Sequence, residues 1–505
     1  MNAKTSAYSE AYSRFVLSGF TRSLLVRLGS LIYIGFLGRA LTLSEMGVIV
    51  FLSISSAIII TSSDFGLHYS MTQRAIFHGA EKGMNIIKSC FISMMVIGPL
   101  YSSMMTVFFL VFIAGIGDVQ LSLEAQIEFL IINISGVIFR TIVAAEVSLM
   151  KVDRSIYLRT LNAVLLYILV IIFFIMRPVI ESVLIGMAVP NIVILLVELG
   201  TMKTIMEHEG VSKSEIFNLL RFGIPVFFAT IASTLSGYVD RWIVFAGLSG
   251  DDLAIYHLMR RLSGVALEFA LVLTTGLFPI YTRLFADSDE RLAKGFSHVL
   301  RIVLTISVPF FLVLFFFAKT VIIIVLSEKY VEGEQVLMAL LIASIFYLIG
   351  IMTISVKIAK GETIKFLIYW LMLLILNVVF GVVLLPYGSE GVAIAILIAS
   401  VIGCLYAIAV TAETRKVPFK WFFRFFIFIV FTSIILFLIV ETIPFPFSLV
   451  IVLSVILFLP ALFGLISLHE FEVIRRVTPK KIEKTVLFYE RISRVGFLPP
   501  IQDLA

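Results

Sequence analysis

Apolar segments long enough to cross a membrane recur along almost the whole chain. A segment of about 18 or more apolar residues can cross the hydrocarbon core of a bilayer as a helix. Of the 505 residues, 60% are hydrophobic and only 14% are charged, and the mean hydropathy is +1.10. Soluble proteins have about a quarter of their residues charged. The sequence therefore predicts an all-α polytopic membrane protein.

The lengths of these apolar segments give a count of about fourteen transmembrane helices. The helices are expected at about residues 15–37, 47–69, 86–114, 127–150, 158–176, 180–202, 222–246, 254–281, 299–326, 336–356, 364–385, 391–411, 421–440 and 447–468.

Two short acidic turns occupy corresponding places in two sets of six spans. One turn, from Arg39 to Gly47, joins the first two spans, and the other, from Phe245 to Ala254, joins the seventh and eighth. This correspondence suggests an internal duplication, and two such halves with a site between them are a common plan for transporters. The plan predicts an N-terminal lobe at residues 1–205, a C-terminal lobe at 206–412, two further helices at 413–468 and a basic cytoplasmic tail at 469–505.

The basic residues of the loops predict how the chain is oriented in the membrane. If the N-terminus is cytoplasmic, the outside loops hold little beyond Arg39, Arg177, Lys319 and Lys329, while every inside loop holds several Lys or Arg. Such a bias is typical of proteins of the bacterial inner membrane, and it places both termini in the cytoplasm. It also explains the net charge of +6 and the pI of about 9.1, so nucleic acid is not an expected partner.

The sequence lacks the signals of a disulfide-bonded protein, a metal site, a nucleotide-driven transporter and a membrane enzyme. Cys90 and Cys404 both lie in apolar segments and indicate neither a disulfide framework nor a metal site. No G-x-x-x-x-G-K-[ST] motif is present, so no nucleotide cofactor is expected. Energy would come from an ion gradient such as that of H⁺ or Na⁺, from the membrane potential or from the substrate's own gradient. No outside loop exceeds about a dozen residues, a length that seldom forms a domain, so a membrane enzyme such as a glycan polymerase is disfavoured.

Charged residues inside the spans are the candidate functional residues. An ionisable residue at the centre of a bilayer costs about 2.5–3.5 kcal/mol on insertion scales, and such residues usually face protein or water. The stretch from Thr230 to Glu268 contains the most charged residues of this kind. Residues three, four and seven apart share one face of a helix, so these charges are expected to form a stripe on each of its two helices. The candidate cavity cations are Arg22, Arg27, Arg140, Arg241, Arg260 and Arg261, and the candidate coupling or cavity acids are Asp64, Asp240 and Glu268.

Structural roles for some of these charges stay open at this point. Asp240 with Arg241, and also Arg22, could extend to the membrane interface. Arg260, Arg261 and Glu268 could form a salt-bridge set that fixes helix packing. Glu146 and Glu198 lie near predicted span ends and are expected to be solvated.

The excess of arginine among these charges indicates an anionic substrate. A guanidinium binds phosphate through two parallel hydrogen bonds and stays charged when it is desolvated. Glu268 could exchange a proton, or pair with an arginine when the substrate is absent, and so couple occupancy to conformation.

Two stretches resemble a known family. They are FLGRALTLSEMGVIVFL with DFGLHYSMTQ, and YVDRWIVFAGLSGDDLAIYHLMRRLSG with LFPIYTRLF. They resemble the polysaccharide-export flippases of the Wzx type, in the superfamily that also holds the MATE drug exporters and the lipid II flippases.

The resemblance implies two six-helix lobes around a central cavity that alternates between the membrane faces. The cargo would be an undecaprenyl-diphosphate-linked oligosaccharide for O-antigen, lipopolysaccharide or another surface glycan. Membrane lipid, a polysaccharide polymerase and chain-length proteins would be partners. In such proteins spans one, two, seven and eight line the cavity, which leaves Arg140 in span four outside that set. A lipid II-type flippase and a MATE-like ion-coupled exporter of small molecules are the alternatives.

Overall fold

The protein is helical throughout the part of the chain that the structure describes. This computed structural model describes residues 26, 29–63, 65–68, 71, 80–116, 121–149, 151–207, 213–274, 288–360, 362–445, 447–448, 451–452, 459–460, 463 and 465. Residues 29–40 are helical, and the elements that follow are α2 (Leu43–Ser62), α4 (Ala80–Ile116), α5 (Leu123–Ser148), α6 (Val152–Met176), α7 (Ile180–Val197), α8 (Leu199–Glu207), α9 (Lys213–Gly247), α10 (Gly250–Thr274), α12 (Asp289–Phe316), α13 (Ala318–Val325), η1 (Glu328–Gly333), α14 (Glu334–Ala359), α15 (Thr363–Leu384), η2 (Leu385–Tyr387), α16 (Gly388–Val410), η3 (Ala412–Lys416) and α17 (Phe419–Thr442). The prediction of an all-α polytopic membrane protein is confirmed.

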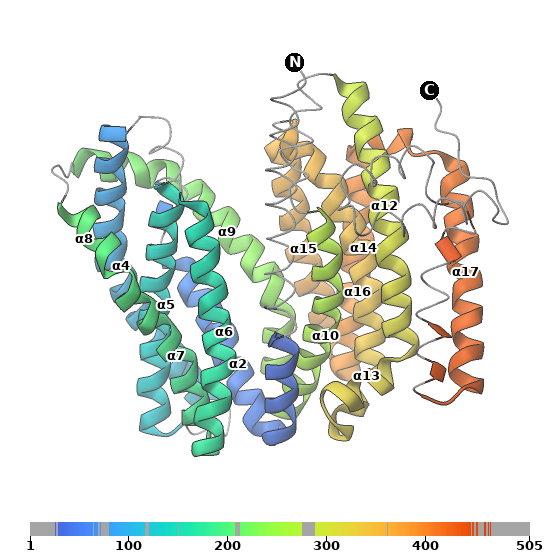
Figure 1. The fold of residues 1–505 in the computed structure, drawn as a ribbon, viewed down its shortest axis with the longest axis horizontal. Helices are drawn as coiled ribbons and strands as arrows, with labels where there is room; N and C mark the ends of the chain where they lie inside the picture. The colour runs from blue at the N-terminus through green and yellow to red at the C-terminus, as the bar shows by residue number, and fades with distance from the viewer. Residues whose placement is uncertain are drawn as a thin grey trace, which may run out of the picture.

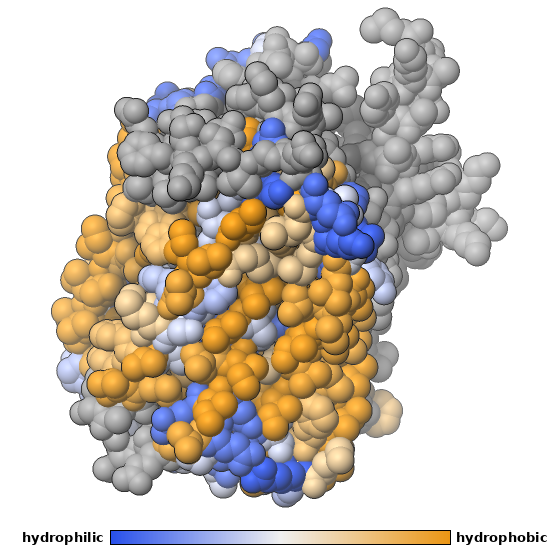
Figure 2. Space-filling view, turned by 90° about the vertical axis from the view of Figure 1, so that its left-hand side faces the viewer, coloured by the Kyte–Doolittle hydropathy of each residue, from blue (hydrophilic) through white to orange (hydrophobic). Residues whose placement is uncertain are grey.

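An apolar belt surrounds the helices. In the described ranges, nine helical stretches are long and apolar enough to cross a membrane, and one of them, Ile364–Val410, contains both α15 and α16. Figure 2 shows this belt on one face of the molecule, with hydrophilic residues gathered above and below it. The exposed residues of α4, which include Leu100, Met104 and Val111, are large and apolar. Such a surface is stable against lipid chains and not against water.

The helices form two bundles joined by a long diagonal helix (Figure 1). The first bundle contains α2 and α4 to α8, and the second contains α10 and α12 to α16, with α17 at its outer edge. Helix α9 runs from the side of the first bundle to contacts with α15 in the second. The predicted residue boundaries of the two lobes stay predictions.

The observed helices begin before the apolar segments do. Helix α12 starts at Asp289, whereas the apolar segment was expected to start near residue 299. Ser288 caps this helix by accepting a hydrogen bond from the backbone N–H of Arg291 at 3.2 Å. Asp289 and Glu290 in the first turn complement the helix dipole, and these are signals of helix starts rather than of membrane depth.

The two acidic turns have the same local structure. Thr42 and Glu45 at the start of α2 form a reciprocal capping box, with the backbone N–H of Glu45 3.2 Å from Thr42 Oγ1. Ser249 and Asp252 form the equivalent pair at the start of α10, with the backbone N–H of Asp252 3.1 Å from Ser249 Oγ. Each box satisfies backbone donors that a helix start leaves free. The matching boxes support the hypothesis of an internal duplication.

We call the end of the bundles that holds Lys88, Arg154 and Lys360 the basic end, and the other the opposite end. At the opposite end, the first two spans contact the second bundle. Arg39 donates to the backbone oxygen of Leu326 at 2.6 Å and also to that of Ile324, just after and within α13, and Lys329 donates to the backbone oxygen of Leu41. Gly47 at the start of α2 lies directly against the backbone of Gly250 at the start of α10. These contacts close the opposite end.

The prediction that Glu146 and Glu198 are solvated is wrong. Their side chains are 0% and 1% exposed, and both lie beside Arg154 of α6, at 3.8 Å and 3.0 Å. Residues on different helices form this cluster, so the position of each acid near a span end did not reveal it. Because an unpaired buried charge is unfavourable, Arg154 stabilises the packing of α5, α6 and α7 at the basic end.

Candidate functional site

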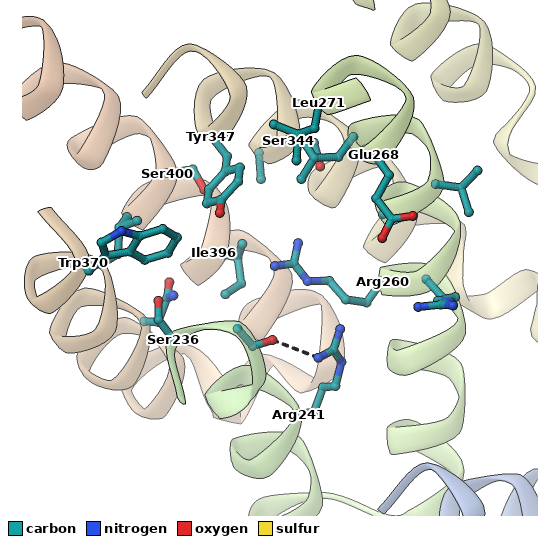
Figure 3. A pocket seen from close by; sticks show the side chains of 18 residues that line it. Ser236, Arg241, Arg260, Glu268, Leu271, Ser344, Tyr347, Trp370, Ile396 and Ser400 are labelled. Carbon is teal, nitrogen blue, oxygen red and sulfur yellow. Dashed lines mark hydrogen bonds between the residues drawn. The ribbon is translucent and has the colours of Figure 1, made fainter. Parts of the chain in front are cut away.

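A cavity in the second bundle contains most of the described candidate residues. It has a volume of about 270 Å³, and α9, α10, α14, α15 and α16 contribute to its wall. Of the predicted residues, Arg241, Arg260, Arg261 and Glu268 line it. We call this space the second-bundle cavity (Figure 3). Its complete lining is Ser236, Gly237, Arg241, Arg260, Arg261, Gly264, Val265, Leu267, Glu268, Leu271, Ala343, Ser344, Tyr347, Trp370, Leu373, Asn377, Ile396 and Ser400.

Neighbouring oxygens hold the guanidinium groups of Arg241 and Arg261 at this cavity, and a ring also contacts that of Arg241. Arg241 Nη1 donates to the backbone oxygen of Gly237 at 2.9 Å, and the Arg241 guanidinium lies 5.0 Å from the centre of the Tyr238 ring. Arg261 Nη2 donates to Ser30 Oγ at 3.0 Å and thereby reaches the helix of residues 29–40. The cavity therefore lies next to the boundary between the second bundle and the first span.

Asp240 is buried behind the cavity wall, where it pairs with Arg260. Its carboxylate is 1% exposed, accepts a hydrogen bond from the Tyr256 hydroxyl at 3.0 Å, and lies 3.4 Å from Arg260 Nε. The backbone N–H of Arg241 also donates to Asp240 Oδ1 at 2.9 Å. Asp240 thus lies in the protein interior and does not extend to the membrane interface. It positions Arg260, whose side chain is 21% exposed and points into the cavity.

The chemistry of the wall suits a negatively charged ligand. Glu268 brings one carboxylate to the same space as the three guanidiniums, and Figure 3 shows it near Arg260. Arginines at a partly desolvated site bind phosphate or carboxylate more strongly than they would in water. In the described part of the chain, no group of three or more His, Cys, Asp or Glu is placed to hold a metal ion.

The sequence did not single out the far wall of this cavity. Tyr347, Trp370, Asn377 and Ser400 come from α14, α15 and α16. An aromatic or amide residue inside an apolar span costs far less than a charge, so such residues have many structural roles and give no distinct signal.

Arg140 lies in a separate cavity of the first bundle. This first-bundle cavity has a volume of about 640 Å³ and is lined by residues of α2, α5, α6 and α7 together with His68. Arg140 Nη2 lies 3.5 Å from His68 Nδ1, and Arg159 of α6 reaches the same space. His68 and Arg159 lie at the ends of the predicted spans 47–69 and 158–176 and were not among the candidate residues. Arg22, Arg27 and Asp64 lie outside the described residues.

A protein family and several solved structures match this chain. The family described as "Polysaccharide biosynthesis protein" matches residues 36–335, which is more than half of the 505-residue chain. A comparison with curated protein sequences finds no match.

Solved structures share the fold at low sequence identity. One described as "Lipid II flippase MurJ, inward closed conformation" has a TM-score of 0.73 and 16% identity, and the match covers 88% of this chain and 98% of that chain. An inward-facing multidrug resistance MATE family transporter of the MOP superfamily has a TM-score of 0.60 and 15% identity, with 78% and 96% covered. A MOP superfamily transporter from Pyrococcus furiosus, described with a binding pocket of reverse polarity, has a TM-score of 0.57 and 15% identity, with 80% and 94% covered.

The family match and the shared fold agree with the two helix bundles and the apolar belt. The chain belongs to the polysaccharide biosynthesis protein family, and it has the fold of the MOP-superfamily flippases and transporters.

Proposed function

We propose that this protein is a flippase that moves undecaprenyl-diphosphate-linked oligosaccharide units from the cytoplasmic to the outer leaflet of the bacterial inner membrane. The observation that carries the proposal is the convergence of Arg241, Arg260 and Arg261 on one cavity inside the second bundle. Several guanidiniums in one such place are costly unless an anion uses them, and a diphosphate fits their paired hydrogen-bond donors. Because the chain belongs to a polysaccharide biosynthesis family, the proposed anionic substrate is a lipid-linked glycan.

Alternating access is the proposed mechanism. By the positive-inside rule the basic end faces the cytoplasm, so both termini are cytoplasmic. The opposite end, closed by Arg39 and Lys329, then faces outward, and the cavity loads from the cytoplasmic side. Release outside requires these contacts to break as the bundles reorient. Glu268 beside the arginines is the proposed coupling acid, and H⁺ or Na⁺ is the proposed coupling ion.

Deletion of the gene in its host tests the proposal. Surface glycan is expected to disappear, and undecaprenyl-linked units are expected to accumulate where an impermeant glycosidase added to spheroplasts does not reach them. Re-expression of the wild-type chain should reverse both effects. An unchanged lipid-linked pool with normal surface glycan would rule out this cargo.

A lipid II-type flippase is the second candidate, because the fold matches a solved lipid II flippase over 88% of this chain. Rescue of growth in cells depleted of their own lipid II flippase would favour it over the oligosaccharide flippase. An exporter of organic cations is disfavoured, since guanidiniums at the cavity repel such substrates.

Filling the second-bundle cavity is expected to stop transport without harming the fold. Gly264 lines the cavity, and a Cβ added there meets no atom within 4 Å. Gly264→Leu should place its side chain in the cavity, while the helix gains up to about 1 kcal/mol from replacement of glycine. We expect normal or raised thermal stability with loss of glycan export, whereas Gly264→Ala, the matched control, should export. Wild-type export by a stable Gly264→Leu protein would place the cargo path elsewhere.

A further inference from the structure

Two polar atoms at the second-bundle cavity have no hydrogen-bond partner in the described part of the chain. They are Asn377 Oδ1, on a residue that is only 7% exposed, and Arg241 Nε. A buried polar atom without a partner costs about 1–3 kcal/mol, so native proteins rarely leave one unless a ligand or water completes it. One atom is an acceptor and the other a donor, and both residues line the same space. Both atoms are buried, so a small rotation of each side chain would present it to a ligand that carries hydroxyl donors and oxygen acceptors.

Two aromatic side chains lie on the same wall of the cavity as Asn377. Trp370 of α15 and Tyr347 of α14 line the cavity with ring centres 6.4 Å apart, on the other side from Glu268 in Figure 3. Phe366 and Tyr369 brace the Trp370 ring edge to face, at 6.1 Å and 5.7 Å. The indole is thus held in one orientation. The negative face of such a ring attracts the polarised C–H groups on the apolar face of a sugar.

The volume limits what the cavity holds. Small-molecule sites usually measure about 300–1,000 Å³, so a cavity of about 270 Å³ lies at the lower limit. It has room for one ring and not for an oligosaccharide. The hydroxyls of Ser236 and Ser400 add further small polar groups to its wall.

We infer that the second-bundle cavity is a monosaccharide subsite, which takes the hydroxylated sugar ring attached directly to the diphosphate of the cargo. The ring stacks on Trp370, Asn377 Oδ1 accepts a hydrogen bond from a sugar O–H or N–H group, and Arg241 Nε donates to a sugar oxygen. Arg260 and Arg261 face the diphosphate. This inference rests on the proposed function, since only a lipid-diphosphate cargo places one sugar beside the arginines. It makes Trp370 and Asn377 the residues that determine which first sugar is accepted.

Binding to the purified full-length protein tests the subsite. The probes are undecaprenyl diphosphate and the same lipid bearing one glucose, galactose, N-acetylglucosamine or N-acetylgalactosamine. We expect at least one sugar to raise affinity about tenfold or more above that for the bare lipid diphosphate. Trp370→Ala and Asn377→Leu should each remove most of this gain and leave binding of bare undecaprenyl diphosphate unchanged, and Trp370→Phe should keep part of it. Ile375 lies on the outer face of the same helix and is 59% exposed. Ile375→Ala is therefore the matched control and should behave as wild type.

The outcomes separate the two ideas. Failure of the wild-type protein to bind any of the probes would count against the proposed function itself. Binding of the bare lipid diphosphate with no gain from any sugar, or a gain that survives in both Trp370→Ala and Asn377→Leu, would overturn the subsite alone. If Trp370→Ala also loses the bare lipid because α15 is disturbed, Asn377→Leu decides, since it replaces an amide with an apolar group of similar size.

Discussion

Arg260→Leu is expected to destabilise the protein strongly and to abolish glycan export. The substitution leaves the Asp240 carboxylate, 1% exposed, without the cation that lies 3.4 Å away. Loss of one partner of a buried ion pair costs about 3–5 kcal/mol, and the hydrogen bonds from Tyr256 and from the backbone of Arg241 do not replace the lost charge. Thermal unfolding of the purified protein should show a large fall in Tm, and cells that express only this variant should lack surface glycan.

Two further variants separate stability from transport. Asp240→Asn leaves Arg260 facing a polar cavity, so its loss of stability should be smaller than that of Arg260→Leu. Asp240→Asn combined with Arg260→Leu removes both charges and should recover most of the Tm, yet export should stay absent because the cation for the cargo is missing. Normal export by the stable double variant would show that Arg260 only serves the packing of α9 against α10.

Gly47→Ala is expected to prevent closure of the opposite end, while Gly250→Ala is tolerated. A Cβ at Gly47 would overlap the carbonyl oxygen of Gly250 and lie 3.0 Å from its carbonyl carbon, so α2 and α10 would have to separate. A Cβ at Gly250, on the other side of the same contact, meets no atom within 4 Å. Gly47→Ala should therefore shift the population toward the outward-open state and stop the cycle.

Cysteine accessibility measures this shift. Ser236→Cys places a thiol in the second-bundle cavity, and both native cysteines, Cys90 and Cys404, are buried. In intact cells, a small impermeant thiol reagent should label Ser236→Cys several-fold faster when Gly47→Ala is also present, and at the unchanged rate with Gly250→Ala. Equal labelling rates in all three proteins would show that this helix contact does not control access from outside.

The fold was largely predictable because the bilayer imposes it. Each apolar segment must be a helix, so the helices of residues 334–359 and 363–384 lie where apolar length placed them. Helix ends were less predictable, since α12 begins at a Ser288 cap outside the apolar segment. The prediction of one continuous ninth span also differs from the structure, where α13 follows α12 as a separate helix after Phe317.

The site was predictable only where charge stood out. Charge alone singled out Arg241, Arg260, Arg261 and Glu268, because a charge inside an apolar span is costly enough to need a reason, and the structure brings the four to one cavity. Trp370 and Asn377 gave no such signal. Their importance depends on which helices pack together, and one sequence does not state that.

The closure of the opposite end also determines how the protein responds to its surroundings. Arg39 and Lys329 both donate to backbone carbonyl oxygens rather than to carboxylates. Backbone carbonyl groups do not take up protons in the physiological range. Acidification of the medium therefore leaves the acceptors of these hydrogen bonds unchanged, whereas ion pairs with carboxylates would be lost as the acids took up protons.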